Sequence, residues 1–86
     1  MPLFYFDLDE CGSLTCDREG RVFSDLEAAK GAAIADARSI MREDIAEGAL
    51  CVSCHINISN ADGTQIARVP FCEAVEIFGL PVGSYG

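Results

Sequence analysis

Five cysteines and one histidine are the side chains of this 86-residue sequence best suited to metal binding or thiol chemistry. They are Cys11, Cys16, Cys51, Cys54, Cys72 and His55. Thiolate sulfur and imidazole nitrogen are preferred zinc ligands, and a thiolate is also a nucleophile and a redox centre. Residues 51–55, with the letters CVSCH, combine a C-x-x-C spacing with an adjacent histidine. This segment is therefore the first candidate site.

A zinc site would draw on this segment and on the C-x4-C pair nearer the N-terminus. The candidate ligands are Cys51, Cys54 and His55 with Cys11 or Cys16. The surrounding pattern, however, predicts a strand, in which residues 51 and 54 point to opposite faces. A turn between them would remove this objection, but Val52-Ser53 lacks the glycine that tight turns favour. We therefore expect no metal site and keep zinc binding as the alternative hypothesis.

The same segment matches the attachment pattern of c-type haem and the C-x-x-C of thioredoxin-like proteins, but its context fits neither. Haem attachment occurs in exported proteins, whereas the start of this chain lacks the basic region of a signal peptide. A redox C-x-x-C lies at a helix N-terminus, whereas this one follows a predicted helix and enters a strand. Because the cysteine count is odd, we expect no disulfide framework, free thiols at Cys11 and Cys16, and no cofactor.

Residues for catalysis are not gathered in any recognisable pattern. The single histidine, His55, is predicted on the opposite strand face from the neighbouring cysteine, so it is not placed to activate that thiol. Four carboxylates form an acidic rim without the spacing of a calcium loop: Asp7, Asp9, Asp17 and Glu19. We assign no catalytic residue, and the sequence leans against an enzyme without excluding one.

Alternating apolar residues predict strands at residues 3–10 and 50–58. Residues 21–23 supply a short return strand after the first, and residues 64–69 return after an Asn60–Gly63 turn and end at Pro70. On the second strong strand, Cys54 is expected to lie with Val52 and Ile56 on the face buried under the helix. Cys51 and His55 are expected to face away.

Ser24-Asp25-Leu26-Glu27 reads as a capping box that begins a helix at Ser24, and the helix should run to about Glu47 with Gly48 as its stop. Its apolar stripe is rich in alanine, which allows close approach to a sheet. Residues 71–78 are predicted to form a short helix that buries Phe71, Val75 and Phe78.

These elements predict one α+β domain over residues 1–86, with 79–86 as a tail. The fold is a β-β-α-β-β two-layer sandwich with a four-stranded antiparallel sheet in the order 2-1-3-4. Because one helix covers only one sheet face, we expect a homodimer. Its apolar contacts would be Leu3, Tyr5, Val82 and Tyr85.

Fourteen acids against six bases give a net charge of −8. Nucleic acid and anionic membranes are therefore excluded as partners, because both require a basic surface. No apolar run reaches the roughly 20 residues of a membrane span. We expect a cytoplasmic protein, with a basic protein as a further partner.

The order of several short motifs resembles a family of small bacterial proteins of unknown function. These motifs are Tyr5-Phe6-Asp7, Asp17-x-Glu19-Gly20, Ser24–Ala29, Asp62-Gly63-Thr64 and Val69-Pro70-Phe71, and the resemblance covers residues 3–77. The resemblance implies no activity and no catalytic residue, and the family pattern does not include these cysteines. We therefore expect a non-enzymatic module that acts by self-association or protein contacts.

Overall fold

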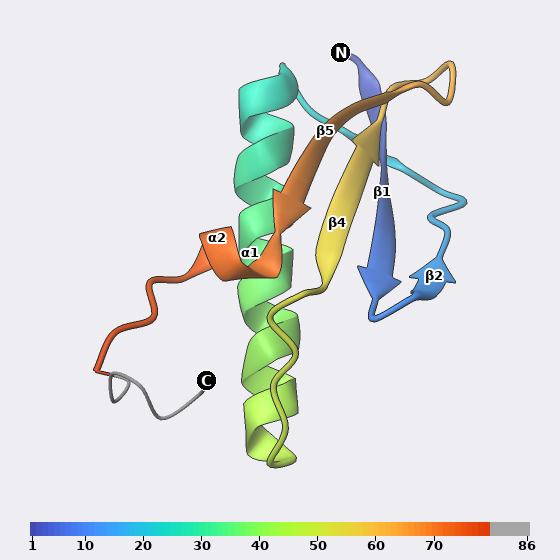
Figure 1. The fold of residues 1–86 in the computed structure, drawn as a ribbon. Helices are drawn as coiled ribbons and strands as arrows, with labels where there is room; N and C mark the ends of the chain where they lie inside the picture. The colour runs from blue at the N-terminus through green and yellow to red at the C-terminus, as the bar shows by residue number, and fades with distance from the viewer. Residues whose placement is uncertain (80–86) are drawn as a thin grey trace.

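The computed structural model describes residues 1–79, in which one long helix packs against one face of an antiparallel sheet (Figure 1). The elements are β1 (Leu3–Glu10), β2 (Ser13–Thr15), β3 (Arg21–Val22), α1 (Leu26–Ala46), β4 (His55–Ser59), β5 (Gln65–Pro70) and α2 (Phe71–Ala74). The predicted α+β class, with one long helix and a short C-terminal helix, is confirmed. Among these described residues, no helix is both long and apolar enough to cross a membrane.

The sheet of the described residues has five strands, in the order β2-β1-β4-β5 with β3 also paired to β1. The predicted neighbours β3-β1-β4-β5 are confirmed, and β1 pairs with β4 in the register Phe6↔Ile58 and Leu8↔Ile56. The prediction of four strands is wrong because it missed β2. β2 has only three residues with a single apolar side chain, Leu14, and is therefore too short to show an alternating pattern.

The core lies between α1 and the sheet. Alanines at 29, 33 and 37 of α1 have no exposed surface, so the helix backbone approaches the strands closely. Opposite them the sheet contributes four buried side chains: Phe4, Ile56, Ile58 and Val69. Burying such apolar surface is the main favourable contribution to folding, and here it fixes the ends of β1 and β4 relative to the helix.

The N-cap of α1 is Asp25, one residue later than predicted. The Asp25 backbone is extended, and its Oδ1 accepts a hydrogen bond from the Ala28 amide at 2.9 Å. An aspartate satisfies an unpaired first-turn amide at least as well as a serine, so the predicted cap at Ser24 is wrong. The predicted stop is confirmed, since α1 ends at Ala46 and Gly48 has a φ of +90°.

The β4–β5 hairpin turns as predicted, because Oδ1 of Asn60 accepts hydrogen bonds from the Asp62 and Thr64 amides. The helix after Pro70 is shorter than predicted and ends at Ala74. Phe71 is buried, but the side chain of Phe78 is 84% exposed, so its predicted burial is wrong. The expected dimer contacts Val82 and Tyr85 lie outside the described residues.

Candidate functional site: a three-cysteine cluster

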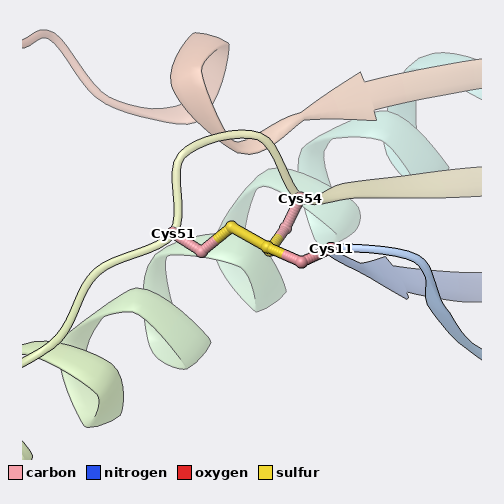
Figure 2. A group of neighbouring side chains, drawn as sticks. All are labelled: Cys11, Cys51 and Cys54. Atoms are coloured by element: carbon pink, nitrogen blue, oxygen red, sulfur yellow. A yellow bond between two sulfur atoms is a disulfide. The ribbon is translucent and has the colours of Figure 1, made fainter.

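Three cysteine sulfurs from two distant segments meet at one end of the sheet (Figure 2). The Sγ atoms of Cys11, Cys51 and Cys54 all lie within 4.8 Å of one another. Cys11 and Cys51 are joined by a disulfide that spans 40 residues of sequence. Cys54 keeps a free thiol whose sulfur lies 3.9 Å from that of Cys11.

Residues 51–54 form a bend rather than the first half of a strand. β4 begins at His55, because neither of the strands beside it, β1 or β5, extends far enough to pair with residues 51–54. On one side of β4, strand β1 ends at Glu10 and turns into β2. On the other side, α2 begins after β5, and the amide of Phe71 donates a hydrogen bond to the Cys54 carbonyl. The prediction that Cys51 and Cys54 lie on opposite faces of a strand is therefore wrong.

Cys11 enters the cluster from a two-residue hairpin turn. Glu10 pairs with Ser13, and the intervening Cys11 and Gly12 have φ values of 52° and 89°. Two positive φ values in succession define the tight turn that favours asparagine followed by glycine. The left-handed conformation is unfavourable for a cysteine, by roughly 1–2 kcal/mol. The turn thus holds the Cys11 sulfur toward the cluster at a cost in backbone energy.

The three sulfurs differ in exposure. Cys54 is 2% exposed and belongs to the hydrophobic core, which confirms its predicted burial together with that of Ile56. Cys51 does not face away as predicted but packs, half-buried, against the core, and Val52 is 39% exposed rather than buried. Cys11 is exposed. The cluster therefore has one inner thiol and two outer sulfurs.

The electrostatic environment of the cluster is negative. Burial raises the pKa of the Cys54 thiol above its usual 9.0; a hydrogen bond from the Cys11 backbone opposes this rise, and the charges of Glu10, Asp44 and Asp9 add to it. At neutral pH the inner thiol is therefore protonated. The same carboxylates provide a negative field that favours a cation at this position.

His55 and Cys16 lie apart from the cluster. His55 is on the outer face of the sheet, as predicted, where its Nε2 is 3.4 Å from Oδ2 of Asp9 and 3.1 Å from Nη2 of Arg68. Cys16 is an exposed free thiol, as predicted, whereas the prediction of a free thiol at Cys11 is wrong. Of the zinc ligands considered from the sequence, the structure brings together only Cys11, Cys51 and Cys54.

The hydroxyl of Ser53 lies beside the cluster. The Ser53 hydroxyl lies 3.2 Å from Sγ of Cys51 and 3.7 Å from Sγ of Cys11. Sequence reasoning missed Ser53, and the only signal for it was its place between the two cysteines. The Cα atoms of Cys11 and Cys51 are 7.5 Å apart, wider than the about 4.4–6.8 Å usual for a disulfide.

The Asp17–Gly20 turn holds the opposite edge of β1. Oδ1 of Asp17 accepts hydrogen bonds from the amides of Glu19 and Gly20, while its Oδ2 accepts one from the amide of Phe6 in β1. Burial alone would raise the pKa of Asp17, but these amides and the charge of Arg21 lower it below 3.8. The D-x-E-G motif is thus a structural device that extends the sheet.

This fold and its motifs define a small α+β module. A family model described as a domain of unknown function (DUF6894) matches residues 3–72, and the chain belongs to this family. The resemblance stated from the motifs is thereby confirmed for a family of unknown function. No curated protein and no solved structure matches the chain.

Proposed function

We propose that this module binds one zinc ion, in its reduced form, through the sulfurs of Cys11, Cys51 and Cys54. The observation that carries the proposal is the convergence of three sulfurs from two distant segments within 4.8 Å. Around one tetrahedral zinc, with Zn–S bonds of about 2.3 Å, ligand sulfurs lie about 3.8 Å apart. Reduction and small side-chain movements convert the present arrangement into that one, and a water completes the fourth position.

Charge supports a cation at this position. Glu10, Asp44 and Asp9 contribute negative charge at Cys54, which disfavours a bare thiolate and favours a divalent ion. Zinc coordination would displace the thiol protons, since the thiolate is the ligating form. Three thiolates are soft ligands, which favour zinc or Cu⁺ over magnesium and calcium.

A zinc ion at this cluster would mainly stabilise the fold. It would tie the β1–β2 hairpin to the segment that follows α1, two regions 40 residues apart in sequence. We propose a non-enzymatic role, since the single histidine of the sequence, His55, is not among the residues that meet at the cluster. We also propose that the protein works in the reducing cytoplasm, where its thiols remain available to a metal.

Elemental analysis tests this proposal. The protein is first reduced with a phosphine, then loaded with zinc and freed of the unbound excess. We expect one zinc per chain, and less than a tenth of that in Cys51→Ser and in Cys54→Ala. Cys16→Ser and Cys72→Ser are matched controls, because both thiols are exposed and lie outside the cluster. Circular dichroism establishes that each variant is folded. Folded wild-type protein without zinc, or zinc retained by both cluster variants, would overturn the proposal.

We also propose that the chain self-associates as a homodimer, through a surface other than the outer sheet face. That face carries Asp7, Asp9 and His55, and its Leu3 and Tyr5 are half-buried. An apolar groove instead lies between the end of α1 and the segment after α2. Four of the large exposed apolar side chains line it: Ile45, Leu50, Ile77 and Phe78. Clustered apolar exposure of this kind is typical of an interface.

Sedimentation at tens of micromolar protein tests this second proposal. We expect a species of twice 9.2 kDa, and dissociation on Phe78→Ser, whose side chain is 84% exposed and contributes little to the fold. The surface variant Ile66→Ser, at a site outside the groove, is the control. A monomer that persists at high salt would contradict self-association and favour a basic protein as the partner.

A further inference from the structure

The disulfide and the proposed metal site use the same atoms. Cys11 and Cys51 are joined in the structure, and the third sulfur of the cluster remains reduced. A disulfide sulfur carries no thiolate charge and is a poor zinc ligand, so the two states exclude each other. The regulation inferred below rests on the proposed zinc site.

The exposure of the three sulfurs decides which pair is oxidised. Cys11 is exposed and Cys51 half-buried, whereas Cys54 is 2% exposed. Because Cys54 is enclosed by the hydrophobic core, a peroxide reaches its sulfur least easily of the three. An oxidant therefore reacts first with the outer pair, and the product is the disulfide present in the structure.

We propose that the cluster is a redox-gated zinc site, in which a peroxide converts Cys11 and Cys51 into a disulfide and so releases the ion. In the first step, one outer thiolate attacks a peroxide oxygen. The O–O bond breaks, a sulfenic acid forms on that cysteine, and hydroxide leaves to become water. In the second step, the other outer thiolate attacks the sulfenic sulfur. The S–S bond forms and a second hydroxide leaves, taking a proton from solvent.

One molecule of hydrogen peroxide is enough to oxidise the two outer sulfurs. The two sulfurs lose two electrons in total, hydrogen peroxide gains them, and two waters are produced. Only Cys54 then remains as a thiolate ligand, which is too few to hold zinc against solvent. A dithiol reductant reverses the change: its thiolate attacks the exposed Cys11 sulfur, and its second thiol resolves the mixed disulfide.

Zinc release during peroxide titration of the zinc-loaded protein tests the gate. A chromogenic chelator would report released zinc, and proteolytic mapping by mass spectrometry would report which cysteines are linked. We expect one zinc released and one Cys11–Cys51 disulfide formed per chain, in parallel. A dithiol should then restore binding of one zinc.

Two variants separate this inference from the zinc proposal. Cys54→Ala should form the Cys11–Cys51 disulfide at the wild-type peroxide dose although it holds little zinc. Cys16→Ser should behave as wild type in both measurements. If the reduced protein binds no zinc, the proposed function fails and the gate with it. If it binds zinc but peroxide releases none, or links a different pair of cysteines, only the gate is overturned.

Discussion

The amide of Phe6 donates a hydrogen bond to Oδ2 of Asp17 at 3.0 Å, and this bond joins a loop to the middle of β1. The amide of Asp17 in turn donates to Oδ1 of Asp7 at 2.8 Å. The carboxylate of Asp17 thus accepts the hydrogen bond that a carbonyl of a neighbouring strand would otherwise accept from the Phe6 amide. The same carboxylate closes the turn through Glu19 and Gly20, so one residue fixes both the turn and its attachment to the sheet.

Replacing Asp17 should therefore destabilise the fold in a pH-dependent way. We expect Asp17→Ala to cost about 2 kcal/mol at pH 7, since hydrogen bonds to a charged acceptor are among the stronger ones. Because the pKa of Asp17 is lowered in the folded state, its contribution is complete above pH 3.8 and is lost as the pH falls through the lower folded-state pKa. Urea unfolding at pH 7 and at pH 3 measures this. An equal difference between wild type and variant at both pH values would contradict it.

The cap of α1 gives a prediction with a neighbouring control. Asp25→Ala should cost about 1 kcal/mol, because the Ala28 amide loses its partner. For a domain of this size, the melting temperature should then fall by roughly 4–8 °C. Ser24→Ala should leave the melting temperature nearly unchanged, since the first turn is capped by Asp25. A larger effect at Ser24 than at Asp25 would mean that the helix begins one residue earlier.

Substitution by alanine should change the stability of the protein in opposite directions at two glycines. A Cβ on Gly31 of α1 would meet nothing within 4 Å, so Gly31→Ala should stabilise the protein by up to about 1 kcal/mol. Gly20 has a φ of +72°, and a Cβ there would lie 3.0 Å from the carbonyl oxygen of Phe4 and 2.9 Å from Leu3. Gly20→Ala should therefore destabilise it by more than 1 kcal/mol, to be compared by thermal melts. Equal shifts at both sites would contradict this packing.

Zinc affinity should depend on pH. Because the pKa of Cys54 is raised above 9.0, this thiol is protonated near neutrality and must lose its proton when zinc binds. We expect the apparent affinity to rise about tenfold per pH unit for each thiol that is deprotonated on binding. Competition with a chelator of known affinity between pH 6 and 8 measures the slope. An affinity independent of pH would exclude Cys54 as a ligand.

The elements that were predicted correctly are those whose sequence pattern lies within their own residues. The alternation at residues 3–10 predicted β1, and the alanine stripe with Gly48 predicted α1 and its end. The start of β4 could not be predicted in this way, because a strand extends only where its neighbours do. β1 turns away at Cys11 and β5 gives way to α2 at Phe71, and both events are set elsewhere in the chain.

The site was predicted only in part for the same reason. Cys11, Cys51 and Cys54 were all among the candidate ligands, but an assumed regular strand separated the last two. His55 was included because it is adjacent in sequence, whereas the pleat places it on the opposite face beside Asp9. The convergence of Cys11 with the others depends on the pairing of Asp9 with His55, which brings the β1–β2 turn beside residues 51–54.

X-ray absorption at the zinc edge of the reduced, zinc-loaded protein tests the central claim most directly, because it counts the ligand atoms. The proposed site predicts three sulfur ligands at about 2.3 Å and one lighter ligand, and two sulfurs in Cys54→Ala supplied with excess zinc. A first shell of nitrogen and oxygen alone, or one that Cys54→Ala leaves unchanged, would contradict the assignment of zinc to Cys11, Cys51 and Cys54.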